Sequence, residues 1–180
     1  GFLAPPGSDV GVSLGEEDIN VIDKIRGIKD YSYATVANAE VDFGGEIKYF
    51  MVIGIPLERL EVYTESGGWG AEYGKELEPG DLGSVMIGSL YGEGRVFDKN
   101  VAVGNKFSIN GERFRVQSIL KSVGNSQDDS SILMGLEDFR RLFEIPDRVD
   151  QIIVQIEEGE DIEKVSERIR IELGGDEEFL

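Results

Sequence analysis

The sequence contains no cysteine and no histidine among its 180 residues. Without cysteine there is no disulfide and no thiolate ligand for zinc, and the redox compartment is left open. Without histidine the chain lacks the commonest general base and the commonest metal-binding side chain. Any catalysis would rest on carboxylate, lysine, tyrosine or hydroxyl groups. We therefore predict that the protein is not an enzyme and that it has no catalytic, cofactor-binding or metal site.

Long hydrophobic runs are also missing. No stretch approaches the roughly 20 apolar residues that a membrane-spanning helix needs, and no signal peptide is visible. The abrupt ends, Gly1-Phe2-Leu3-Ala4 and Glu178-Phe179-Leu180, are those expected of a segment cut from between two membrane helices. A complete small protein is the alternative, and composition does not decide between the two.

Positive charge is scarce, because 18 basic residues face 36 acidic ones and the net charge is -18. The resulting field repels phosphate backbones and anionic headgroups, so nucleic acid is excluded as a partner. The plain function of this charge is solubility. Hydrophobic residues nevertheless make up 40% of the chain, which is enough for one packed domain or for two small subdomains.

The first 62 residues predict a helix followed by a long hairpin. Ser13 and Glu16 have the spacing of a capping box, and the helix after them carries Ile19, Ile22 and Ile25 on one face, with Gly27 as its stop. Two alternating strands over residues 33–55 then flank Gly44-Gly45, a two-residue hairpin signal. On the return strand, one face is predicted to hold Ile47, Tyr49, Met51 and Ile53.

A polar, glycine-rich stretch over residues 64–83 interrupts this pattern and suggests a subdomain boundary or a mobile loop. It contains Trp69, with Tyr73 nearby. A tryptophan in such a loop is either an exposed anchor for a partner protein or a ring that the loop buries beneath itself. Both alternatives stay open, and Trp69 and Tyr73 are the candidate partner contacts.

The remaining elements alternate between short strands and helices. Residues 107–120 predict a second hairpin with Asn110-Gly111 as its turn. Short apolar strands are expected at 85–88 and 132–134, a helix at 136–143, a strand at 152–156 and a last helix capped by Asp161. We predict an α+β fold with a discontinuous porter-like α/β subdomain, formed by residues 1–62 plus 149–180, and a smaller inserted α/β subdomain at 63–148.

Three polar segments are weak candidates for ligand sites. Gly92-Glu93-Gly94-Arg95 lacks both phosphate-loop patterns and is predicted to be a flexible loop. The oxygens of residues 125–129 lack calcium-loop spacing, so we expect a solvated turn in which Asp129 or Ser130 ties down the backbone. The acidic run at 157–163 suits a helix entrance better than a catalytic carboxylate pair.

Several short segments follow one another in a characteristic order and spacing: Ile25-Arg26-Gly27-Ile28, Val85-Met86-Ile87-Gly88, residues 103–111, 114–120, Asp128-Asp129, 132–134, Arg141-Leu142-Phe143 and 150–154. Through these segments together the chain resembles the MacB-like periplasmic core domain of FtsX-like ABC transporter permeases.

This resemblance implies a domain on the extracytoplasmic side of the cell membrane, between the first two transmembrane helices of a permease. It implies an ABC ATPase as a partner, a homodimer in the full transporter, a possible extracytoplasmic protein partner, no cofactor and no catalytic residue. Such a domain passes ATP-driven motion to an exported substrate or partner. The competing readings are a stand-alone secreted ligand- or protein-binding domain and a carboxylate hydrolase.

Overall fold

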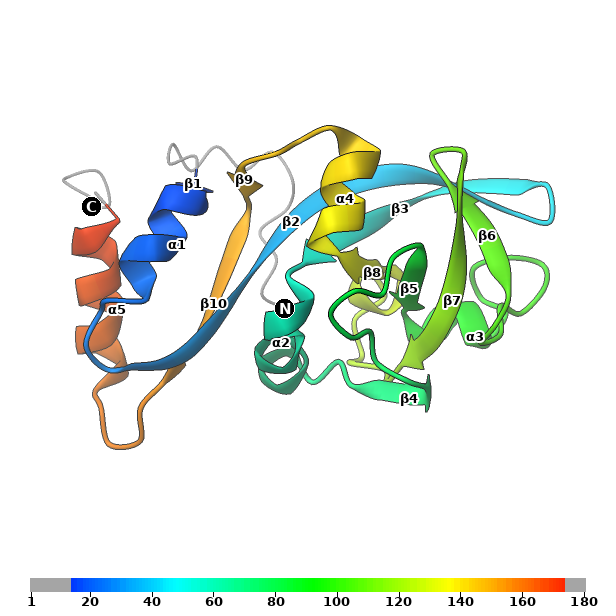
Figure 1. Ribbon diagram of the computed structural model, residues 1–180. Coiled ribbons are helices and arrows are strands. Elements are labelled where there is room, and N and C mark those ends of the chain that lie inside the picture. The colour runs from blue at the N-terminus through cyan, green and yellow to red at the C-terminus, as the bar shows by residue number, and fades with distance from the viewer. Residues whose placement is uncertain (1–13, 174–180) are drawn as a thin grey trace.

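One long strand runs through both parts of the molecule in the computed structural model, which describes residues 14–173 (Figure 1). This strand, β2 (Ile28–Phe43), has 16 residues and a length of roughly 50 Å at about 3.3 Å per residue. Its first half belongs to a part built with helices α1 and α5, and its second half belongs to a closed ring of strands. The predicted mixed fold of helices and sheets is confirmed.

The other elements follow in chain order around this strand. They are β1 (Leu14–Gly15), α1 (Glu16–Ile22), β3 (Glu46–Ile55), η1 (Leu57–Arg59), α2 (Leu60–Gly67), β4 (Ala71–Gly74), β5 (Ser84–Ile87), α3 (Ser89–Gly92), β6 (Lys106–Ile109), β7 (Glu112–Leu120), η2 (Asp128–Ser130), β8 (Ile132–Gly135), α4 (Leu136–Phe143), β9 (Arg148–Val149), β10 (Gln151–Ile156) and α5 (Ile162–Glu172).

In the helical part, β10 pairs antiparallel with the first half of β2. Helices α1 and α5 cover one face of this strand pair. The predicted isoleucine face is confirmed, since Ile19, Ile22 and Ile25 are buried there. The predicted capping box is wrong, because α1 starts at Glu16 with Gly15 as its cap and Asp18 accepts from the Gly15 amide at 2.7 Å. Ser13 lies outside the described residues.

Gly27 does not stop α1, which ends earlier at Ile22. Instead Gly27 has a φ of +95° and lets α5 approach closely, since a Cβ there would stand 2.9 Å from Val165 Cγ2. At the start of α5, the predicted cap is confirmed because Asp161 accepts from the amides of Glu163 and Lys164.

Six strands close into a ring in the order β2, β3, β8, β5, β7, β6 and back to β2. The pairs β3–β8 and β5–β7 are parallel and the other four are antiparallel. The interior is filled by apolar side chains from all six strands and from α3 and α4. Phe139 of α4 packs directly on β3 at Gly54, where a Cβ would lie 2.5 Å from the ring.

Both predicted hairpins are confirmed. Gly44-Gly45 joins β2 to β3 with positive φ at both residues, and Asn110-Gly111 joins β6 to β7 in the same way. Residues with positive φ at both turn positions match the twist of the flanking strands. Short buried β8 and helix α4 also lie where the sequence predicts them.

A second apolar cluster covers the outer face of the ring. It combines α2 and the loop after it with the outward side chains of β3, β5, β7 and β8, and it reaches β10 through Ile153. The division into residues 1–62 plus 149–180 and 63–148 remains a prediction. In the structure β3 contributes Val52 to the ring interior and Met51 to the outer cluster, so the hairpin of the first segment packs with the inserted one.

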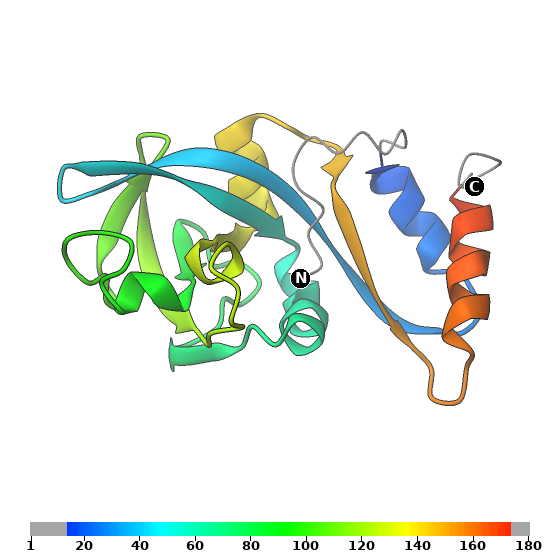
Figure 2. The ribbon, with the colours of Figure 1, turned by 180° about the vertical axis from the view of Figure 1, so that it is seen from behind.

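The described chain begins and ends at the same end of the molecule. β1 and the last turn of α5 lie at the upper left in Figure 1 and at the upper right in Figure 2, which shows the molecule from behind. The ring and the β2–β3 hairpin point away from this end. No helix within residues 14–173 is long and apolar enough to cross a membrane.

Candidate functional site

Trp69 is a core residue. Its side chain is only 8% exposed, and its ring meets Tyr63 of α2 edge-on with 5.4 Å between centroids. Leu77 and Leu120 belong to the same cluster. Of the two alternatives, the loop that buries its own ring is the one observed, so the reading of Trp69 as an exposed anchor is corrected. The physical reason is that α2 offers an aromatic partner one turn before the loop.

Tyr73 lies on β4 and is 60% exposed. β4 is the last strand of the sheet, and its register on β7 shifts between Ala71 and Tyr73. Trp69 faces the interior while Tyr73 faces solvent, so the two rings do not form one contact surface. Tyr73 remains a predicted partner contact.

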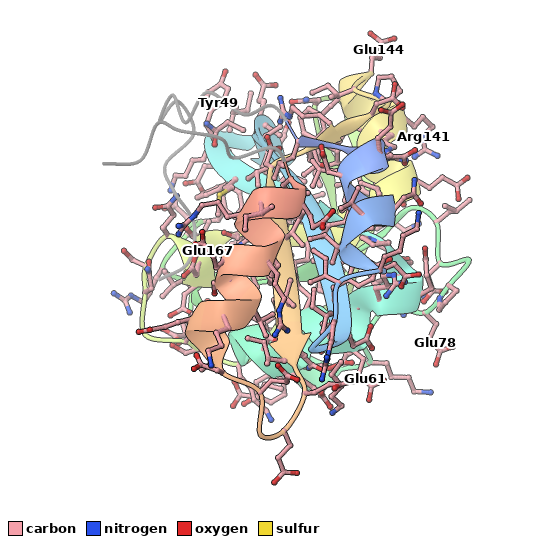
Figure 3. The ribbon with its side chains drawn as sticks, turned by 90° about the vertical axis from the view of Figure 1, so that its left-hand side faces the viewer. Tyr49, Glu61, Glu78, Arg141, Glu144 and Glu167 are labelled. Carbon is pink, nitrogen blue, oxygen red and sulfur yellow. The ribbon has the colours of Figure 1, made fainter. Side chains whose placement is uncertain are left out.

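The tip of the β2–β3 hairpin exposes two residues that the sequence placed on an apolar face. Ile47 is 53% exposed and Tyr49 is 70% exposed, while Met51 and Ile53 further along the same face are buried. The Tyr49 hydroxyl contacts Glu40 Oε2 at 3.1 Å. The sequence held a signal for this exposure. Glu40 lies opposite Tyr49 on β2, and a face covered by other elements would not place a charged residue there. Tyr49 points outward in Figure 3.

Where β2 passes from the helical part into the ring, the segment β9–β10 is tied to it by side chains. Asp150 Oδ2 accepts from the Val36 amide at 2.7 Å and from Arg148 Nε at 3.0 Å. Arg148 also donates to the Val36 carbonyl, and the Thr35 hydroxyl donates to the Arg148 carbonyl. This joint (Thr35, Val36, Arg148 and Asp150) fixes the path of both strands at the boundary between the two parts.

Two further ion pairs cross the same boundary. Arg140 of α4 contacts Glu16 of α1 at 2.6 Å. Arg59 of η1 contacts Asp30 at 3.1 Å and lies over the ring of Tyr31 at 3.9 Å. Burial raises the pKa of Tyr31, and the Arg59 cation opposes that rise. Movement of the helical part against the ring would therefore strain charged contacts as well as the strand.

The buried carboxylates serve the fold. Asp129 accepts from the Ser122 hydroxyl at 2.7 Å and the Val123 amide at 2.8 Å, so it ties down the local backbone as predicted. The turn is predicted to be solvated, but the Asp129 side chain is buried. Asp138 of α4 accepts from the Gly83 amide and from Arg141, each at 2.7 Å. Within residues 14–173 no three acidic side chains gather closely enough to hold a metal ion.

Comparison with known proteins gives consistent matches over most of the chain. Residues 3–171 match the family model of the MacB-like periplasmic core domain. The chain is 37% identical over 169 residues to an uncharacterized ABC transporter permease of Methanocaldococcus jannaschii. That match covers 91% of the chain and 42% of the relative, so the chain spans about two fifths of the curated protein.

Two solved structures share the fold. One is the extracellular domain of the noncanonic ABC-type transporter YknZ from Gram-positive bacteria, with a TM-score of 0.73 and 19% identity over 91% of this chain and 83% of that one. The other is the periplasmic region of MacB from Actinobacillus actinomycetemcomitans, with a TM-score of 0.74 and 15% identity over 92% of this chain and 75% of that one.

Proposed function

Because the chain belongs to the family of MacB-like periplasmic core domains, we propose that it passes ATP-driven motion from an ABC transporter permease to an exported substrate or partner protein. The domain lies on the extracytoplasmic side of the cell membrane and connects to two transmembrane helices of that permease. An ABC ATPase supplies the motion, and two copies of the permease form a homodimer.

The observation that carries this proposal is the path of β2. The strand starts beside α1 and α5, where the described chain begins and ends, and reaches the far side of the ring (Figure 1). Two attachment points on one side can both follow membrane helices, and a hydrogen-bonded strand of roughly 50 Å transmits their displacement. The joint at Thr35, Val36, Arg148 and Asp150 keeps β9–β10 from slipping along β2.

A role without catalysis agrees with the side chains present. Within residues 14–173 the buried acids are Asp129 and Asp138, and each already accepts hydrogen bonds that hold a loop or a helix. A general base needs a free position beside a substrate. The exposed tip of the β2–β3 hairpin and Tyr73 are instead placed to contact an extracytoplasmic protein.

The test uses the full-length permease in lipid nanodiscs. Since the chain contains no cysteine, Ile171→Cys on α5 and Ile47→Cys on the hairpin tip each give one label in this domain. Both native side chains are exposed, at 62% and 53%. We expect a quencher attached to lipid headgroups to quench the label at 171 strongly and the label at 47 weakly.

Motion is measured on the same variants. Spin labels at position 47 in the two copies of the dimer should change their separation when ATP is added, while labels at position 171 report the membrane side. Equal quenching at both positions would overturn the placement. An ATP-independent distance at position 47 would overturn the transmission of motion.

A further inference from the structure

A cleft lies between the end of α1 and the last turns of α5. Its volume is about 450 Å³, within the range of about 300–1,000 Å³ typical of small-molecule sites. Six residues line it: Val21, Lys24, Ile25, Arg26, Arg168 and Glu172. Figure 3 faces this end of the molecule and shows α1 and α5 side by side.

The lining is positively charged in a strongly acidic protein. Arg168 is held in place, because its Nη1 donates to the Arg26 carbonyl at 2.8 Å and contacts Glu160 at 3.3 Å. No carboxylate of the described residues lies within ion-pairing distance of Lys24 or Arg26. Lys24 and Arg26, which have no acidic partner among residues 14–173, thus share the lining with one positioned guanidinium, and Glu172 is the opposing charge in it.

The lining also has an apolar side. Ile25 is buried in the core between α1, α5 and β10, and Val21 is partly exposed beside it. Lysine and arginine next to an apolar wall suit a ligand that joins an anionic group to an apolar body. A fully hydrated anion would use the charges and leave the wall unused.

We propose that this cleft binds a phosphate-type anion, with Lys24 and Arg26 contacting its oxygens and Arg168 providing a fixed donor. An anionic phospholipid headgroup and free phosphate share this chemistry. The position of the cleft favours the headgroup, because Glu172 is the last residue of α5 and the neighbouring Ile171 is exposed. This choice of source rests on the proposed function, which turns this end of the molecule toward the membrane.

The net charge of -18 does not prevent such binding. At physiological ionic strength the Debye length is about 8 Å, so acidic residues farther away act weakly on a ligand within the cleft. Because salt also screens the attraction between the ligand and Lys24 and Arg26, we expect binding to weaken as salt is added.

The experiment titrates the isotope-labelled chain, followed by amide NMR, with three separate probes. These are inorganic phosphate, dihexanoyl phosphatidylglycerol and dihexanoyl phosphatidylcholine. We expect saturable shifts at residues 21–27 and 165–172, with phosphatidylglycerol binding more tightly than either other probe. Equal affinity for inorganic phosphate would keep the anion site and overturn the headgroup as its source. No saturable shift with either anionic probe would overturn the site itself.

A matched pair of variants tests the residues. Lys24→Gln with Arg26→Gln should weaken phosphatidylglycerol binding by roughly tenfold or more, because two charge-assisted contacts are lost. The control, Lys106→Gln with Arg113→Gln, removes the same two charges from exposed positions on β6 and β7. Equal weakening in both variants would show attraction by net charge alone and would overturn the cleft. Since no permease is needed, these outcomes do not depend on the nanodisc test of the proposed function.

Discussion

At the scale of single residues, two aromatic side chains from one glycine-rich segment take opposite roles. Trp69 fills the cluster under α2 and Tyr73 stands on the surface of β4. Mutation of Tyr73 should therefore test contact with a partner, whereas mutation of Trp69, four positions earlier, tests support of the fold.

We predict that Trp69→Ala lowers the free energy of unfolding by about 3–5 kcal/mol, the usual cost of deleting a large buried ring. Tyr73→Ala should change it by less than about 0.5 kcal/mol, as expected at an exposed position. Urea unfolding followed by circular dichroism measures both, because Trp69 is the single tryptophan and its fluorescence is lost with it. A small effect of Trp69→Ala would contradict the burial described for its ring.

Tyr63, the partner of Trp69, makes the stability of the fold depend on pH in the alkaline range. Burial strongly raises the pKa of Tyr63, and burial also raises that of Tyr91. The neutral phenol is thus favoured in the folded state, so its stabilising effect is complete below about pH 10, the ordinary tyrosine value, and is lost as pH rises above it.

The free energy of unfolding should consequently fall above about pH 10 by up to about 1.4 kcal/mol per pH unit for each buried tyrosine. Tyr63→Phe should make this decline shallower, because it removes one of the two most deeply buried phenols and leaves Tyr91 as the other. Tyr73→Phe is the control at an exposed phenol and should keep the wild-type decline. Urea midpoints measured between about pH 8 and pH 11.5 test this prediction. If stability declines with pH as steeply in Tyr63→Phe as in the wild type, the assigned role of Tyr63 is wrong.

At the scale of elements, the strand pair β2–β10 depends on its side-chain joint. Only β2 pairs with β10 in the described sheet, so one edge of β10 lacks a strand partner there. Where the pairing of β2 with β10 ends, the Asp150 carboxylate takes the place of a backbone acceptor, because it accepts a hydrogen bond from the Val36 amide. Local opening of this pair is expected to begin where that carboxylate is lost.

For Asp150→Ala we expect hydrogen exchange at Val36 and along β10 to accelerate by roughly 5- to 30-fold, corresponding to about 1–2 kcal/mol of lost local stability. Amides of β5 in the ring should exchange at the wild-type rate. Asp147→Ala, at an exposed position on the same connection, is the control. Acceleration that spreads equally into β5 would show that the joint is not a local feature.

Local signals in the sequence predict the individual helices and strands better than they predict which strands pair with one another. The Gly44-Gly45 and Asn110-Gly111 turns fix both hairpins, because each turn type sets the register of its own strands. The parallel pairing of Val52–Ile55 with Ile132–Gly135 has no such signal. A four-residue apolar strand fits beside many others, so the closure of the ring could not be predicted.

The candidate site shows the same limit. Alternation correctly placed Ile47 and Tyr49 on the face of Met51, yet it could not show where α2 ceases to cover that face. The joint combines Arg148 and Asp150, which are neighbours in sequence, with Val36, which is 114 positions from Asp150. No spacing rule connects residues so far apart.

At the scale of the whole molecule, the excess of acidic groups opposes the compact state. The net charge is -18, and the ion pairs that relieve it involve mostly exposed side chains, which stabilise little. Screening of the repulsion should thus outweigh screening of the ion pairs.

Raising NaCl from about 0.02 M to about 0.5 M shortens the Debye length from about 20 Å to about 4 Å. We expect stability to increase by about 1 kcal/mol, seen as a rise of about 2–4 °C in the midpoint of thermal unfolding. A variant with Glu61→Gln, Glu72→Gln and Glu78→Gln, all exposed positions, should be more stable at low salt and respond less. A midpoint that falls with salt would refute the dominance of repulsion.

The alternation of β2 has a consequence for how such a chain can vary in length. Tyr31 and Tyr33 face the helical part, and Ala39 and Val41, on the same side of the pleat, face the ring interior. Inserting or deleting one residue between them would turn one of these sets toward the wrong side, whereas a change of two would keep both. Natural length variants of this domain should hence change β2 in even steps and collect odd ones in the turns.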